Sequence, residues 1–134
     1  MDHQPHNLGT TYPAIVGKVL TALRAQRNMP QKDLAQAVGV TQANWSRIES
    51  GHTSVTLEHL RRAAQALDIP PAQILAIADQ TEVEASVQGV TIVDAKGVHD
   101  LHPGLILLAG AALGIFVTYA IMKSKSGVMK GTLL

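Results

Sequence analysis

The sequence predicts an all-α protein: five short helices over residues 13–79, a short linker, and a single apolar helix near the C-terminus. Three observations support this prediction. Apolar residues recur with helical spacing from Pro13 to Ile77, in short blocks separated by turn residues. Aromatic residues make up only 3% of the chain, so the interior must pack on aliphatic side chains and alanines. Finally, the 19 residues from Gly104 to Met122 carry no charged side chain.

The first helix is expected to begin at Pro13, after a polar N-terminal tail over residues 1–12. Proline suits the first turn because its missing N–H would have no partner there. The apolar stripe of this helix consists of Ile15, Val16, Val19, Leu20 and Leu23. Asn28, Met29 and Pro30 are expected to end it.

Turn and capping residues define the next four helices. A second helix is expected over residues 31–38 and a third over 42–50. Gly39 suits the left-handed residue that ends the second helix, and Thr41 suits the N-cap of the third. Thr56 is expected to cap the fourth helix, and Pro70–Pro71 to open a fifth, short one.

The C-terminal part of the chain divides into three segments. Residues 80–102 are interpreted as a linker, because TEVEASVQGVTIVDAKG alternates partly and suits either a hairpin or an extended segment. Residues 103–123 are expected to form the apolar helix, and 124–134 a polar tail. Nineteen uncharged helical residues are about 28 Å long, close to the hydrocarbon thickness of a bilayer. We therefore favour a transmembrane helix over a helix buried in an oligomer.

Catalytic and metal-binding patterns are absent from the sequence. It contains no cysteine and no P-loop, G-x-S-x-G or H-E-x-x-H motif, so we expect a non-enzyme without cofactor or metal. The pairs His3/His6 and His99/His102 lack further ligands and are interpreted as ordinary polar residues.

The strongest signal is the segment QKDLAQAVGVTQANWSRIESG, residues 31–51. It predicts two short helices joined by a tight turn at Gly39–Val40–Thr41. The inward residues Leu34, Ala35, Val38, Trp45 and Ile48 would fix the angle between them. At that angle the second helix presents its outer face to a DNA major groove, which is about 12 Å wide.

Several motifs in order resemble the lambda-repressor-like (Cro/XRE) helix-turn-helix family. They are L-R-x-x-R at 23–27, Q-x-x-L-A at 31–35, G-V-T-Q at 39–42, R-I-E-S-G at 47–51, and the later apolar pattern from Leu60 to Leu67. The resemblance implies the five-helix all-α fold of that family and double-stranded DNA as the partner.

The resemblance also implies roles for individual residues. Gln31 would bind a DNA phosphate, Gln42 would pair with adenine, and Arg47 would read guanine. Arg47 has the alternative of pairing with Glu49. The full set of expected DNA-binding residues is Gln31, Thr41, Gln42, Ala43, Asn44, Ser46 and Arg47.

Charge and the apolar helix both predict a dimer. Residues 1–79 carry seven Lys and Arg against six Asp and Glu, so a monomer is expected to bind DNA weakly. Within the apolar helix, Gly110, Gly114 and Thr118 place small residues on one face, where two helices can pack closely.

These observations together predict a membrane-anchored, sequence-specific DNA-binding protein that acts as a dimeric transcriptional regulator. It is expected in the inner membrane with the helix-turn-helix domain in the cytoplasm, although the lysines after the apolar helix favour the opposite orientation. Two alternatives remain: a membrane adaptor whose helix-turn-helix binds a protein, and a self-assembling protein with the apolar helix as its core.

Overall fold

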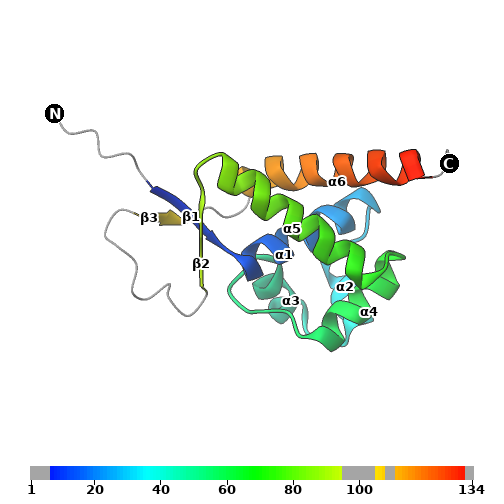
Figure 1. Cartoon of the computed structure of the whole chain (residues 1–134). Coiled ribbons are helices and arrows are strands. Elements are labelled where there is room, and N and C mark those ends of the chain that lie inside the picture. The colour runs from blue at the N-terminus through cyan, green and yellow to red at the C-terminus, as the bar shows by residue number, and fades with distance from the viewer. Residues whose placement is uncertain (1–6, 95–104, 108–110, 132–134) are drawn as a thin grey trace.

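The computed structural model describes residues 7–94, 105–107 and 111–131. Five helices follow one another in the first part of the chain: α1 (Tyr12–Gln26), α2 (Gln31–Val38), α3 (Gln42–Glu49), α4 (Leu57–Leu67) and α5 (Pro71–Val87). A sixth helix, α6 (Ala111–Gly131), lies beside α5 (Figure 1). Three short strands are β1 (Asn7–Thr11), β2 (Thr91–Val93) and β3 (Leu105–Leu107).

The ends of the helices follow the capping residues in the sequence. The Thr41 hydroxyl accepts a hydrogen bond from the Asn44 N–H at 3.1 Å, and Thr56 does the same for His59 at 3.1 Å. Gly39 ends α2 in the left-handed region, with φ 88°. The predicted roles of Gly39, Thr41 and Thr56 are thereby confirmed.

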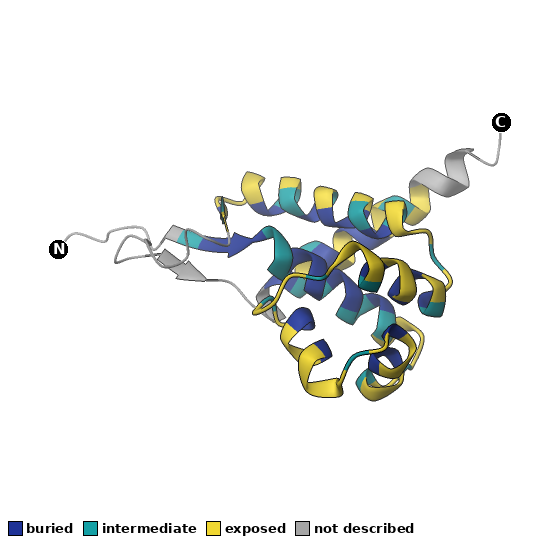
Figure 2. Cartoon of the chain, turned by 90° about the horizontal axis from the view of Figure 1, so that it is seen from below, coloured by how far each residue is buried: buried dark blue, intermediate teal, exposed yellow. Residues whose placement is uncertain are grey.

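Helix α1 is the central element of the core. Its stripe of Ile15, Val16, Val19, Leu20 and Leu23 is buried, as are the inward residues of the other helices (Figure 2). Gly17 of α1 lies directly against the C-terminal end of α3, where a Cβ would overlap the carbonyl oxygens of Ile48 and Glu49. The absence of a side chain at Gly17 therefore sets how closely α1 and α3 approach.

The fold is mostly helical, as expected, but it is not all-α, because three segments form a small parallel sheet in the order β2-β1-β3. Thr10 lies opposite Ile92, and Leu8 lies opposite Ile106. The sheet includes residues 7–11, which were expected in a flexible tail, and residues 91–93, which were expected in a linker. Local patterns did not reveal it because each strand pairs with a segment far away in sequence.

Helix α5 is longer than the sequence suggested, since it continues beyond residue 79 to Val87. Thr81 and Ala85, one helical turn apart, are fully buried on its inner side. The Thr81 hydroxyl donates to the Ile77 carbonyl at 2.8 Å, so this buried polar group is satisfied within the helix. Part of the expected linker thus extends the surface on which α6 packs.

Helix α6 differs from the transmembrane helix expected over residues 103–123. It begins at Ala111, and residues 105–107 form β3. Leu113, Val117, Ala120 and Ile121 are buried on its inner side, where α6 packs against α1 and α5. Among the described residues, no helix has the length and apolar character needed to cross a membrane. In the described part of α6, the inner side of the helix contacts the apolar surface that α1 and α5 provide.

The small residues expected to pair two apolar helices have other surroundings. Gly114 faces the Lys18 side chain of α1, and the exposed Thr118 donates its hydroxyl to the Gly114 carbonyl at 2.8 Å. Gly110 lies outside the described residues. The two described members of the set therefore line the α1 side of α6.

Candidate nucleic-acid interface

Helix α3 has one buried side and one exposed side. Trp45 and Ile48 face the core, with 0% and 4% exposure. The expected DNA-binding residues of this helix are all exposed: Gln42, Ala43, Asn44, Ser46 and Arg47. An exposed helix side of polar and small residues beside one arginine suits insertion into a major groove.

Arg47 is available for an external contact. Among the described residues no carboxylate forms an ion pair with it, so the alternative pairing with Glu49 is not found. Its backbone carbonyl accepts hydrogen bonds from the N–H groups of His52 and Thr53, at 2.9 and 3.2 Å. These bonds hold the backbone at the end of α3 while leaving the guanidinium of Arg47 exposed.

The residue that sequence reasoning missed is Glu49, a buried carboxylate that joins three helices. Arg24 of α1 donates to both of its oxygens, from Nε at 2.8 Å and from Nη2 at 3.1 Å. Trp45 donates its indole N–H to Oε1 at 2.8 Å, and Gln31 of α2 donates from Nε2 to Oε2 at 2.9 Å. Two paired charges with four hydrogen bonds satisfy this buried group fully.

The Glu49 network changes the interpretation of Gln31. This residue is half-buried at the start of α2, and one N–H of its amide is used by Glu49. A primary amide carries two N–H donors, so the bond to Glu49 uses only one of them. Gln31 therefore helps to fix α3, which is a role that the sequence did not predict.

Helix α4 supports the turn between α2 and α3 from the other side. Arg62 donates from Nη1 to the Val38 carbonyl at 3.1 Å, at the end of α2, and from Nε to Glu58 at 3.2 Å. The hydrogen bond from Arg61, followed by the contacts with Arg62, holds the pKa of the exposed Glu58 below its usual value. The orientation of the α2–α3 pair is thus set by α1 through Glu49 and by α4 through Arg62.

Metal-ligating groups do not gather in the described part of the chain, where no three His, Asp or Glu side chains lie close enough to share an ion. The pairs His3/His6 and His99/His102 lie outside the described residues. The described histidine nearest the end of α3 is His52, whose Nδ1 lies 2.7 Å from the Ser50 hydroxyl.

A family model described as "Helix-turn-helix" matches residues 20–74, which cover α2, α3, α4 and parts of the flanking helices. Residues 20–74 form a helix-turn-helix domain. The β-strands and α6 lie outside the matched residues. The elements that distinguish this chain are therefore additions to that domain.

Part of this chain is similar to solved structures of regulators. The clp gene regulator ClgR from Corynebacterium glutamicum is 26% identical with a TM-score of 0.56, over 57% of this chain and 82% of that one. A point mutant of the restriction-modification controller protein C.Esp1396I is 19% identical with a TM-score of 0.51, over 55% and 95%. The controller protein C.AhdI from Aeromonas hydrophila is 29% identical with a TM-score of 0.45, over 46% and 94%.

A comparison with curated proteins found no match. The helix-turn-helix domain and its similarity to a gene regulator support a DNA-binding regulator and a non-enzyme. They do not extend to the membrane anchor expected from the sequence.

Proposed function

We propose that this protein is a sequence-specific regulator of transcription that reads double-stranded DNA with α3. The observation that carries the proposal is the exposed Arg47, which pairs with no described carboxylate, on a helix whose orientation is fixed by the buried Glu49 network. Arg47 is the candidate for a guanine contact and Gln42 for an adenine contact, because their side chains match the donors and acceptors of those base edges. The small side chains of Ala43 and Ser46 would allow α3 to approach the bases closely.

The remaining expected residues would position the protein on the DNA backbone. Thr41 uses its hydroxyl as the N-cap of α3, so its contribution is to place the start of this helix. Asn44 is exposed beside it and suits a phosphate or a base edge, while Gln31 retains one amide N–H for a phosphate. Contacts of this kind set the register, whereas Gln42 and Arg47 supply the sequence preference.

We further propose that the active form is a homodimer. The support is the small number of cations near α3, since phosphate neutralisation supplies much of the affinity of a DNA-binding protein. A dimer doubles those contacts and requires a site with two half-sites about one helical turn apart. Sedimentation equilibrium of the full chain, with and without a selected DNA site, tests this proposal directly.

The decisive experiment is selection of bound sequences from a random DNA library at low salt, followed by titration of the selected site. If the proposal holds, Arg47→Ala costs about 1–3 kcal/mol and relaxes preference at one base pair. Lys32→Ala, on α2, is the matched control: loss of a phosphate contact there would weaken all sequences equally. A chain that selects no sequence refutes the proposal and favours a helix-turn-helix that binds protein.

The position at the inner membrane remains a separate proposal, supported by the uncharged run Gly104–Met122 in the sequence. Cell fractionation followed by an alkaline wash tests it. Retention in the membrane pellet indicates a spanning segment, release indicates a peripheral protein, and absence from the pellet before washing refutes the proposal.

A further inference from the structure

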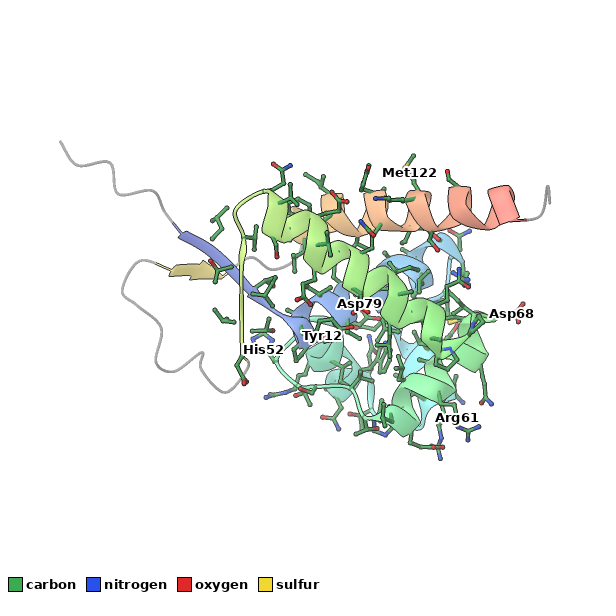
Figure 3. All side chains as sticks on the ribbon, in the orientation of Figure 1. Tyr12, His52, Arg61, Asp68, Asp79 and Met122 are labelled. Atoms are coloured by element: carbon green, nitrogen blue, oxygen red, sulfur yellow. The ribbon has the colours of Figure 1, made fainter. Side chains whose placement is uncertain are left out.

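The outward side of α6 carries large apolar side chains that no described part of the chain covers. Ile115, Tyr119 and Met122 are 72%, 52% and 64% exposed. Their spacing of four and three residues places them along one side of the helix. Met122 points away from the helix-turn-helix domain, on the opposite side of the molecule from Arg61 (Figure 3). We call these three residues the α6 outer face.

The α6 outer face continues into a shallow groove between α6 and α1. Small residues line the floor of this groove, namely Ala22 and Ala25 of α1 and Gly114 and Thr118 of α6. The polar residues that line it are Lys18, Thr21, Gln26 and Thr118, and none of its lining residues is an aspartate or a glutamate. The combined surface is therefore partly apolar and carries no acidic side chain.

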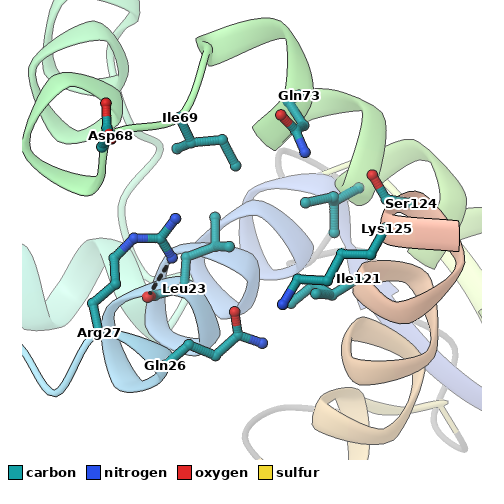
Figure 4. Close-up of a pocket in the computed structure, with 10 residues that line it drawn as sticks. Leu23, Gln26, Arg27, Asp68, Ile69, Gln73, Ile121, Ser124 and Lys125 are labelled. Atoms are coloured by element: carbon teal, nitrogen blue, oxygen red, sulfur yellow. Dashed lines mark hydrogen bonds between the residues drawn. The ribbon is translucent and has the colours of Figure 1, made fainter. Parts of the chain in front are cut away.

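Lysines flank this surface on both sides. Lys18 lies against Gly114, and the Lys123 ammonium lies 6.0 Å from the centre of the Tyr119 ring. Lys123 is also 3.8 Å from Glu84, a long contact for an ion pair. Further along α6, Lys125 lines a pocket opposite Arg27, the residue that follows α1 (Figure 4). An apolar stripe between cations is complementary to a surface with apolar chains and anionic head groups.

We propose that the α6 outer face binds the surface of an anionic membrane, with α6 lying in the interface rather than crossing it. Ile115 and Met122 enter the boundary between head groups and acyl chains, and Tyr119 occupies the interface that amphipathic aromatic rings favour. The flanking lysines attract anionic lipids, with about 1 kcal/mol contributed by each near the surface. The α6 outer face would thus hold the protein at the membrane, as proposed above, and this role does not depend on DNA binding.

Two other partners fit this surface less well. A second copy of the chain seated on the groove would cover Lys18, and no carboxylate of the groove could compensate its charge. If DNA bound here, Ile115 and Met122 would face a charged phosphate backbone, with which apolar side chains make no favourable contact. Charge and apolarity together therefore select a lipid surface.

The test is co-sedimentation of the full chain with vesicles of equal parts phosphatidylglycerol and phosphatidylcholine, beside vesicles of phosphatidylcholine alone. We expect preferential, salt-sensitive binding to the anionic vesicles. Met122→Glu should reduce that binding by about tenfold, because it places a carboxylate at the membrane interface. Lys18→Gln should reduce it about fivefold, which corresponds to the contribution of one lysine.

Leu57→Glu is the matched control, since Leu57 is 82% exposed but belongs to α4, outside the α6 outer face. It should bind vesicles like the unmodified chain, and Met122→Glu should keep its far-ultraviolet circular dichroism and its DNA affinity. The proposal would be overturned if the chain bound no vesicles, or if it bound both kinds of vesicle equally. It would also be overturned if Met122→Glu and Leu57→Glu lost vesicle binding to the same extent. A vesicle-independent dimer that Met122→Glu dissociates would overturn it as well, and would assign the face to a second copy.

Discussion

Removal of the Glu49 carboxylate is the sharpest test of how α3 is held against α1 and α2. Glu49→Ala leaves Arg24 without its counter-charge at a position where the Arg24 side chain is only 17% exposed. It also removes the acceptors for Trp45 and Gln31. The variant therefore leaves four N–H donors, from three residues, without their acceptor at the junction of α1, α2 and α3.

The expected loss of unfolding free energy is about 3–5 kcal/mol, as for other buried pairs that lose one partner. Glu49→Gln keeps the shape and one acceptor oxygen, so its loss should be smaller, about 1–3 kcal/mol. Glu58→Ala is the matched control, because Glu58 pairs with Arg61 and Arg62 on the surface with its side chain 53% exposed. Its expected cost is much smaller than that of Glu49→Ala, because ion pairs on the surface contribute little to stability.

Urea denaturation followed by circular dichroism measures these differences, with the fluorescence of Trp45, the one tryptophan of the sequence, as a second probe. A red shift of the folded-state emission is expected in Glu49→Ala if water enters beside the indole. The double variant Arg24→Met/Glu49→Met should recover much of the loss, since it leaves no unpaired charge. If Glu49→Ala costs no more than Glu58→Ala, the network does not hold α3 and the argument is refuted.

Three further predictions concern the packing of the helices. Gly17→Ala should destabilise the fold by about 1–3 kcal/mol through overpacking against α3, whereas Gly114→Ala, which meets only the flexible end of a lysine, should be neutral or stabilising in thermal melts. The pKa of Tyr12 is raised by burial and then by the hydrogen bond that its hydroxyl donates to Asp79 of α5. Its folded-state pKa lies above the unfolded value of about 10, so the stabilisation is complete below that pH and declines as pH rises above it. Tyr12→Phe should show a smaller decline of stability above pH 10 than the control Tyr119→Phe; equal declines would contradict the assignment. Val117→Ala, at a fully buried position of α6, should lower stability by about 1–3 kcal/mol in urea, and an unchanged midpoint would mean that α6 does not pack on the domain in solution.

Local signals in the sequence were sufficient for the helix-turn-helix domain. The left-handed glycine at Gly39, the N-caps at Thr41 and Thr56, and the apolar spacing within each helix all act over a few residues. They predict α2 at residues 31–38 and identify which side of α3 is exposed. The candidate DNA-binding residues on α3 follow from the same spacing, because the buried Trp45 and Ile48 fix the helix orientation.

The network around Glu49 was not predictable in this way. Its four hydrogen bonds join residues 24, 31, 45 and 49, and only the bond between Trp45 and Glu49 follows a helical spacing. From the sequence, Glu49 was interpreted as a possible partner of Arg47. The arrangement of α1 against α3 decided that Arg24 is the partner and that Arg47 stays exposed.

By itself, the sequence determined the helices of the helix-turn-helix domain and the exposed side of α3, since both follow from capping residues and apolar spacing within a few residues. The tertiary structure decided the parallel sheet, the extension of α5 and the position of α6, because each depends on a partner surface distant in sequence. The same uncharged run that suggests a membrane span finds an apolar surface on α1 and α5 for Leu113, Val117, Ala120 and Ile121. Hydropathy reflects the free energy gained when apolar side chains leave water, and only the fold determines which surface then covers them.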